Sequence, residues 1–214
     1  MLRPAMSLCL FVSSARADAP AILEKLSRAR VGERCVVHTP ASARDPFLHD
    51  GAAPALVVQA YFADLASLDG GIPVLETILG PQAQCEAMAV SRFPVPEPGS
   101  GGCAYLVAYA GPAEDPAAWH AHYNAQHAPL MAELPGIREL EVYAPVDWRK
   151  RGGTWKALRS LQRNKVAFDT PAALEAALAS PVRAKMRADF ATFPPYRGGV
   201  THYPVLSFNP WPTN

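Results

Sequence analysis

Short apolar runs and helical patterns alternate along the chain, and turn-forming residues separate them. A short apolar run bounded by turn residues is typical of a strand, and apolar residues three and four apart are typical of a helix. The order of elements in the first half is strand-helix-strand-strand-helix-strand, as in a ferredoxin-like unit. The predicted strands are Leu8–Ser14, Arg34–Thr39, Ala55–Phe62 and Cys85–Phe93, and the predicted helices are Pro20–Ala29 and Leu65–Leu79, the latter with a break at Gly70 and Gly71.

The same order returns after a segment rich in proline and glycine. Residues 1–93 are therefore predicted to form a degenerate first repeat, 94–102 a linker, and 103–214 a second repeat that shares the pattern but not the residues. In each half the loop between the two middle strands is long. The second repeat is predicted to have strands at Ala104–Ala110, Ile137–Tyr143, Ser160–Phe168 and Val200–Ser207, and helices over Pro116–Leu134 and from Pro171 to Met186 and beyond.

Several predicted strands, such as those in CAYLVAYA and ALVVQAYFA, are apolar on both faces. A sheet with helices on one side and water on the other would alternate apolar and polar residues. The second face is therefore predicted to be covered by the sheet of the other half. The predicted fold class is α+β, with tandem ferredoxin-like βαββαβ repeats whose antiparallel sheets pack as an internal, pseudo-dimeric α+β barrel. A monomeric barrel and a homodimer of such barrels both fit this pattern.

Composition narrows the class of partner. The 214 residues carry a net charge of +1, which provides no field to attract nucleic acid or an anionic membrane. The segment Met6–Ser14 followed by Ala15-Arg16-Ala17 imitates a signal peptide, but we interpret it as the first strand, and no run is long enough to span a membrane. The predicted location is cytoplasmic. The four cysteines are scattered over predicted strands, so we expect reduced thiols in the core.

Three of the six histidines lie in the stretch HAHYNAQHAPL, residues 120–130. On a helical wheel, His120, Tyr123 and His127 share the apolar face, and His122 is predicted to face solvent. His120 and His127 are seven residues apart, or about 10.5 Å along a helix axis. His122 and His127 are five apart and are predicted to face different ways. Neither pair has the spacing of a helical zinc site, so no metal is predicted.

An acid–base role suits this helix better. An imidazole partly enclosed by apolar residues titrates near neutrality and can move a proton next to a carbonyl group. His127 is the predicted proton-transfer residue, with Tyr123 one turn away and able to bond its ring or the substrate, and with His120 assisting. Trp119 is a predicted aromatic wall of the substrate site. The structural alternative is a buried histidine that bonds a backbone carbonyl.

Two further features bear on this site. Pro129 lacks a backbone donor, so it is predicted to loosen or kink the helix near Ala125. In the last strand, either His202 or Tyr203 points to the helix layer, because alternate strand residues face opposite sides. Both are therefore predicted as substrate-binding residues.

The loop 147–159 holds the one basic cluster of the sequence, together with Trp148, Trp155 and the pair Gly152-Gly153. It is interpreted either as a lid that closes on an anionic or aromatic ligand, or as a solvated surface loop.

The second half resembles the EthD-like family of the dimeric α+β barrel superfamily. The similar residues are the helix Trp119–Leu130, the Leu134-Pro-Gly-Ile-Arg138 segment that leads into a strand, and Ser180-Pro181 followed by Asp189-Phe190. The resemblance covers residues 103–207. The first helix of the first half lacks these residues, which predicts one site per chain.

The resemblance implies a small-molecule enzyme, because relatives include lactone isomerases, cyclases, cofactor-free monooxygenases of polyketide aromatics and haem-degrading oxygenases. The fold does not choose among these activities. The leading expectation is an acid–base isomerase or cyclase, then a cofactor-independent monooxygenase, acting on an aromatic or lactone-like ligand. No cofactor is expected, with a haem bound through His127 as the minor alternative. A non-catalytic ligand-binding or structural accessory protein is the rival expectation.

Overall fold

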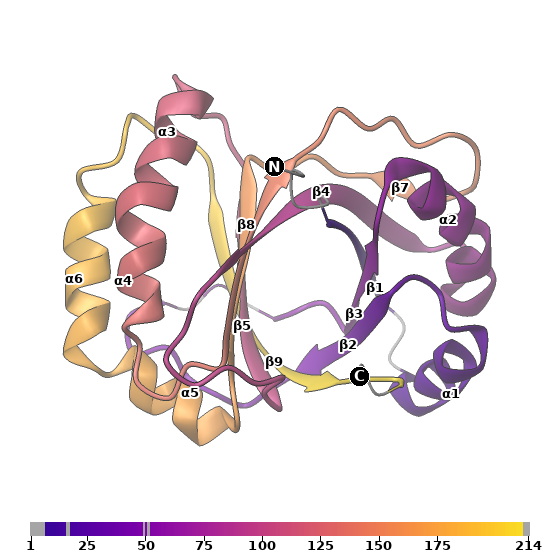
Figure 1. Cartoon of the computed structure of the whole chain (residues 1–214), viewed down its shortest axis with the longest axis horizontal. Helices are drawn as coiled ribbons and strands as arrows, with labels where there is room; N and C mark the ends of the chain where they lie inside the picture. The colour runs from indigo at the N-terminus through magenta and orange to yellow at the C-terminus, as the bar shows by residue number, and fades with distance from the viewer. Residues whose placement is uncertain (1–6, 16–17, 49, 51, 212–214) are drawn as a thin grey trace, which may run out of the picture.

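The computed structural model describes residues 7–15, 18–48, 50 and 52–211. Its elements follow the predicted order closely (Figure 1). The first half contains β1 (Leu8–Ser14), α1 (Ala19–Ala29), β2 (Arg34–Pro40), β3 (Leu56–Phe62), α2 (Leu65–Leu79) and β4 (Ala83–Phe93). The second half contains β5 (Cys103–Tyr109), α3 (Pro116–His122), the π-helix η1 (Tyr123–His127), α4 (Ala128–Ala132), β6 (Glu139–Pro145), β7 (Lys156–Ala157), β8 (Gln162–Phe168), α5 (Pro171–Leu178), α6 (Pro181–Phe190) and β9 (Val200–Phe208).

The strands close into one antiparallel barrel. In the part of the chain that the structure describes, the ring runs β1-β3-β2-β9-β5-β8-β6-β4 and returns to β1, while the short β7 lies parallel to β4. The two halves meet at the pairs β2–β9 and β4–β6. Within each half the strands follow the same spatial order, namely fourth, first, third and second. The predicted α+β class and the antiparallel barrel are confirmed.

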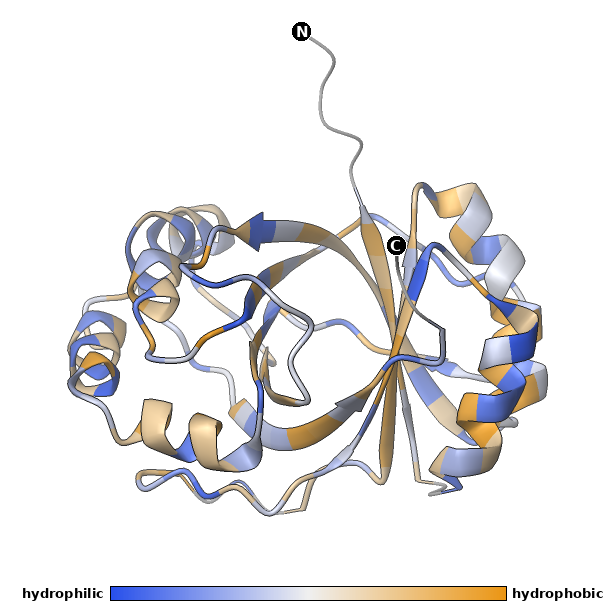
Figure 2. Cartoon of the chain, turned by 60° about the horizontal axis from the view of Figure 1, so that its bottom comes forward, coloured by the Kyte–Doolittle hydropathy of each residue, from blue (hydrophilic) through white to orange (hydrophobic). Residues whose placement is uncertain are grey.

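The helices cover the outside of the barrel in two separate layers. Figure 1 shows α1 and α2 on one side and α3, α4, α5 and α6 on the other, with the strands between them. Figure 2 shows alternating hydrophobic and hydrophilic bands along α1 and α2, as expected for helices with one face on a sheet. Leu26 of α1 and Leu75 of α2 are fully buried in the core of the first layer. Trp119 of α3 and Phe168 of β8 are fully buried in the core of the second.

The barrel interior is also packed, and part of it is charged. Glu141 accepts hydrogen bonds from the hydroxyls of Tyr61 and Tyr143, both at 2.6 Å, and pairs with Lys165 at 2.8 Å. Burial acts to raise the pKa of Glu141, but Lys165 and Arg34 hold it well below its usual range. Since Tyr61 and Arg34 belong to the first half and the others to the second, this cluster joins the two halves.

The long loop of the first half packs on the second half. The backbone N–H of Arg44 donates to Glu175 Oε1 at 2.8 Å, and Asp45 accepts from the Tyr105 hydroxyl at 2.7 Å. Asp45 also pairs with Arg183 of α6 at 3.1 Å. The loop between β2 and β3 therefore packs against α5 and α6 of the second half.

The long loop of the second half packs on the first half in return. Glu76 of α2 accepts from the backbone N–H of Thr154 at 3.0 Å and pairs with Lys150 at 3.3 Å. The indole of Trp148 donates to Asp69 at 2.8 Å, and that of Trp155 donates to the backbone oxygen of Gly80 at 2.7 Å. The basic loop is thus neither a lid over the histidine-rich helix nor a freely solvated loop, because its tryptophans anchor it to α2.

Some predicted boundaries are wrong for local reasons. Helix α2 continues through Gly70 and Gly71, and a Cβ at Gly71 would meet the Phe62 ring at 2.8 Å, so the glycine serves close packing. The helix predicted from Pro171 onward breaks before Pro181 into α5 and α6. The parallel pairing of β7 with β4 was not predicted.

The signal-like N-terminus is only partly described. Residues 1–6 and 16–17 lie outside the described residues, while Leu8–Ser14 forms β1 as predicted. Among the described residues, no helix has the length and apolarity needed to cross a membrane. The four cysteines are buried and free, as expected.

Candidate active site

The histidine-rich helix widens into a π-helical turn just before Pro129. The backbone N–H of Ala128 donates to the oxygen of Tyr123, five residues earlier, in place of the usual four. Pro129 has no N–H to continue the regular ladder. The loosening predicted near Ala125 is therefore present as the π-helix η1.

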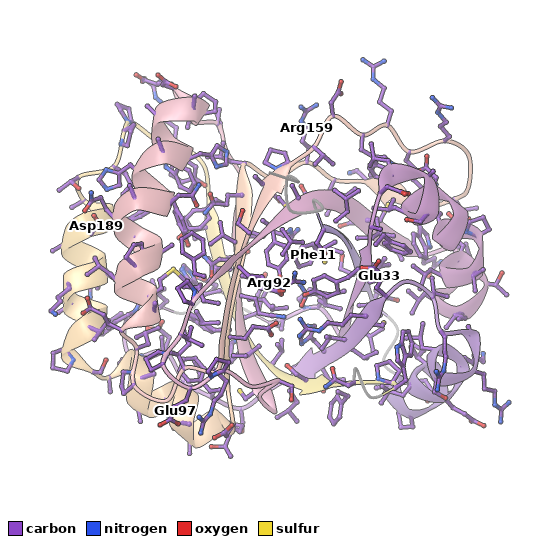
Figure 3. All side chains as sticks on the ribbon, viewed as in Figure 1. Phe11, Glu33, Arg92, Glu97, Arg159 and Asp189 are labelled. Atoms are coloured by element: carbon purple, nitrogen blue, oxygen red, sulfur yellow. The ribbon has the colours of Figure 1, made fainter. Side chains whose placement is uncertain are left out.

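This π turn changes where His122 points. Residues five apart align on a π turn, so His122 and His127 both reach Asp189 of α6, at 3.0 Å through Nε2 and at 2.8 Å through Nδ1. Figure 3 labels Asp189 on α6, beside the helix that carries both histidines. The prediction that His122 faces solvent is wrong, because the wheel assumed a regular α-helix. In the sequence, Asp189 stands out only as half of the Asp-Phe pair that carries the family resemblance.

The His127 ring is held in one tautomer. A carboxylate accepts, so the bond to Asp189 places a proton on Nδ1 and leaves Nε2 as the ring's acceptor. The residue is 4% exposed. Burial lowers the pKa of His127, and this effect outweighs the opposing effect of Asp189. The imidazole is consequently neutral at neutral pH and able to take up a proton.

His127 lines a small enclosed cavity between the outer face of the sheet and the helices. Its volume is about 30 Å³, which has room for one or two water-sized groups. The polar side chains around it are those of Tyr105, Tyr109, His127, Asn164, Arg183 and His202. The apolar walls are Val107, Met131, Leu134, Val166, Leu178 and Met186.

Two buried polar atoms on the cavity residues have no partner within the described chain. They are Oδ1 of Asn164, an acceptor, and Nε of Arg183, a donor. Asn164 is 2% exposed and Arg183 is 9% exposed. Because a buried polar atom without a partner is destabilising, such atoms indicate a place where a water or a ligand group binds.

Side chains from both halves build the site. Asp45 from the first-half loop holds Arg183 and the Tyr105 hydroxyl, and Asp50 accepts from Nδ1 of His202 at 2.6 Å. The Tyr105 and His202 rings stack with centroids 5.6 Å apart. Sequence analysis missed Asp45, Asp50 and Arg183, because pairings across about 60 to 150 residues leave no local pattern.

An open groove of about 1070 Å³ reaches the same place from outside. It runs between the described part of loop 40–53, the end of α5 and β9. Tyr105 and His202 line both the groove and the enclosed cavity. A ligand in the groove would therefore approach the cavity past these two rings.

The other predicted site residues lie further from the cavity. Tyr123 is fully buried, and its hydroxyl donates to Met131 Sδ at 3.2 Å and accepts from Asn164 at 2.5 Å, so it does not bond the His127 ring as expected. Burial raises the pKa of Tyr123 well above its usual value. His120 bonds Gln162 at 3.0 Å. Trp119 is buried and stacks on Tyr123, with centroids 5.3 Å apart.

Of the two candidates in β9, the structure places only His202 toward the helices. Tyr203 faces the barrel interior and lines a separate cavity of about 220 Å³ there, together with Phe11, Glu86 and Arg163. Figure 3 labels Phe11 at the centre of the barrel. Within the described residues, no group of three histidine, cysteine, aspartate or glutamate side chains is arranged to hold a metal ion.

Residues 111–194 match the family model described as EthD domain. Three solved structures share the fold along nearly the whole chain. An anthrone oxidase-like protein has a TM-score of 0.58 at 13% identity, covering 99% of this chain and 96% of its own. A candidate monooxygenase from Lactobacillus acidophilus NCFM has a TM-score of 0.58 at 10% identity, covering 94% of each chain. A mutant chlorite dismutase from Candidatus Nitrospira defluvii has a TM-score of 0.52 at 11% identity, covering 95% of this chain and 93% of its own.

The likeness at these identities is one of fold. Among curated proteins, none matches the chain in sequence. The site must therefore be interpreted from its own geometry.

Proposed function

We propose that the protein is an enzyme that moves a proton on a small molecule, with His127 as the proton-transfer residue. The match of residues 111–194 to the EthD domain model is in keeping with this proposal. One observation carries this proposal. A buried imidazole, fixed at Nδ1 by Asp189, lines a cavity whose other polar residues include unpartnered hydrogen-bonding atoms. That arrangement is typical of a general base next to a binding site for an oxygen-bearing substrate.

The chemistry follows from the two sides of the ring. Nε2 of His127 takes a proton from the substrate, and Asp189 stabilises the imidazolium that forms. Negative charge that develops on a substrate oxygen is stabilised by Nε–H of Arg183. Since the cavity is buried, these interactions are stronger than they would be in water.

Isomerisation or cyclisation is the reaction class that this arrangement supports best. Both need a base and a stabilised oxyanion, the two roles that we propose for His127 and Arg183. The open groove of about 1070 Å³ has room for the ring of an aromatic or lactone-like ligand, and the small cavity would take only its reacting group. Cofactor-independent oxygenation is the second candidate, supported by the shared fold with a candidate monooxygenase and an anthrone oxidase-like protein.

The remaining candidates do not contact the substrate in this proposal but hold residues near it in place. Tyr123 orients Asn164, which lines the cavity, and His120 acts through Gln162. Trp119 supports the ring of Tyr123 from behind. These are positioning roles, since none of the three lines the cavity.

A haem does not fit these residues. The enclosed space of about 30 Å³ beside His127 is far smaller than a macrocycle, and His127 does not line the open groove. We therefore propose catalysis without a cofactor. We also interpret the two halves as tandem ferredoxin-like repeats, supported by their common strand order.

The rival proposal is a non-catalytic binding or structural protein. Native mass spectrometry of protein purified from its own source, followed by incubation of the released ligand with fresh protein, separates the two. Recovery of a chemically altered ligand supports an enzyme. Recovery of the same molecule unchanged, from both wild type and His127→Gln, contradicts our proposal.

A further inference from the structure

A second histidine lines the same cavity with the same tautomer as His127. Nδ1 of His202 bonds Asp50 Oδ2 at 2.6 Å, so the proton lies on Nδ1 and Nε2 is the acceptor. His127 comes from the helix layer, whereas His202 comes from the sheet, on β9. The cavity therefore has two carboxylate-paired imidazoles on two different elements.

Two contacts fix the orientation of His202, namely its bond to Asp50 and a ring stack. Its ring stacks on Tyr105 at a plane angle of 30°, and the Tyr105 hydroxyl donates to Asp45. Asp45 in turn pairs with Arg183, whose Nε has no partner within the described chain. One connected cluster thus orients both the second imidazole and the group that would bind a substrate oxygen.

The two histidines differ in their access to solvent. His202 lines the open groove as well as the cavity, while His127 lines only the cavity and is 4% exposed. His202 is therefore the one of the two imidazoles that lines both the groove and the cavity.

We propose that His202, oriented by Asp50, is a second proton-transfer residue, and that the substrate is a carbonyl compound whose proton moves between two of its carbon atoms. This inference rests on the proposed function of His127. It favours isomerisation over oxygenation, because an oxygenation initiated by proton removal needs only one base.

The proton count balances over one turnover. Neutral His127 removes a proton from the carbon next to the carbonyl. The electron pair of that C–H bond forms a carbon–carbon double bond, and the π pair of the C=O bond moves to the oxygen, next to Nε–H of Arg183. His202 enters as the imidazolium and gives its Nε2 proton to the second carbon. The π pair of the distal carbon–carbon double bond forms the new C–H bond, the oxygen pair re-forms the C=O bond, and the remaining double bond is conjugated with it. His127 ends protonated and His202 neutral. One proton then leaves His127 and another reaches His202 from water in the groove.

The pH dependence is set by the charges around each ring. His127 faces Asp189, His122 and Arg183. Burial is the main cause that lowers the pKa of His127 and of His202 below the usual 6.5. The working form carries one proton on the pair, so it is most abundant below neutrality. The rate should therefore follow a bell-shaped profile with its maximum below pH 6.5.

The facing groups of His202 are Asp50, Asp45, Arg183 and Tyr105. The two aspartates act to raise the pKa of His202, against burial and Arg183. Asp50→Asn removes the nearest of these charges. It is expected to shift the bell to lower pH, which a merely structural role of Asp50 would not do.

The test uses cyclohex-3-en-1-one as the probe, in D₂O, with the full chain. Proton NMR follows two events separately, namely deuterium entry at C2 next to the carbonyl and deuterium entry at C4 with conjugation of the double bond. Wild type is expected to catalyse both. His202→Gln is expected to keep C2 exchange and to lose conjugation by about 100-fold, and His127→Gln is expected to lose both.

His38→Gln is the matched control, because His38 is a buried histidine of the barrel interior, bonded to Gln59 and Ser207, and does not line the cavity. It should leave both events unchanged. Equal loss of C2 exchange and conjugation in His202→Gln, or loss of neither, would overturn the two-base proposal while leaving His127 as a base. A His127→Gln variant that keeps both events, or a wild type that catalyses neither, overturns the proposed function as well.

Discussion

His122 and His127 lie five residues apart and bond the two oxygens of a single carboxylate. Asp189 accepts from both rings because the intervening π turn brings them to the same side of the helix. One carboxylate on α6 therefore fixes both the tautomer of His127 and the docking of α6 on the histidine-rich helix.

Asp189→Asn should lower both activity and the pKa of His127. The carboxylate raises the His127 pKa against the effect of burial, so its loss lowers the pKa further. Activity is expected to fall by about 100-fold, because the imidazolium loses its counter-charge. Histidine NMR titration and turnover of the carbonyl probe measure the two effects. His122→Gln is the control, and a loss as large as that of Asp189→Asn would show that docking of α6, not the charge, is what matters.

Stability should fall as the pH is lowered from about 6.5 toward 3, mainly through His38. Burial lowers the pKa of His38 to about 3 from 6.5 in the unfolded chain. The unfolded state therefore binds more protons in this window, and stability rises with pH across it. The gap corresponds to at most about 5 kcal/mol. Urea unfolding of wild type and His38→Gln between pH 4 and pH 8 measures it, and equal slopes in the two proteins would contradict the assignment.

Asp45→Ala should destabilise the protein by about 3 kcal/mol. The substitution leaves Arg183 buried without its ion-pair partner and leaves the Tyr105 hydroxyl without an acceptor. Glu24→Ala is the matched control, since its partner Arg28 is 77% exposed and such pairs contribute less than about 1 kcal/mol. Denaturant midpoints at pH 7 compare the two. Similar losses in both would mean that the contacts of Asp45 with the second half contribute little to the free energy of unfolding.

Glu76→Ala should release the basic loop without affecting the site. Glu76 of α2 accepts from Thr154 and pairs with Lys150, so it holds the basic loop against a first-half helix. His127 does not take part in these contacts. Trypsin is expected to cut after Lys150 or its arginine neighbours faster in the variant, while turnover stays unchanged. Glu175→Ala removes the contact of Arg44, in the loop between β2 and β3, and should not change cleavage in the basic loop. Loss of turnover in Glu76→Ala would indicate a lid.

Much of the barrel could be predicted from sequence because its signals are local. The boundaries of β1 match the prediction, and those of β2 and β3 agree within one residue, since apolar runs and turn residues mark strand ends directly. Apolarity on both faces of β3 and β5 indicated that a second layer covers them. The inward direction of His127 also followed from the helical pattern.

The rest of the site could not be predicted, because it depends on contacts distant in sequence. The π turn rotates His122 toward Asp189, and no periodicity announces it. The loop between β2 and β3 places Asp45 and Asp50 in a site whose predicted residues all lie in the second half. The first half of the chain thus supplies two carboxylates to a site in the second half.

The most direct test of the central claim compares His127→Gln with His38→Gln in the deuterium-exchange assay. Glutamine can still bond Asp189 through its amide N–H, so the melting temperature of His127→Gln should stay close to that of wild type. The account predicts that C2 exchange of cyclohex-3-en-1-one falls by at least about 100-fold in His127→Gln and stays unchanged in His38→Gln. Exchange at the wild-type rate in a folded His127→Gln protein would contradict it.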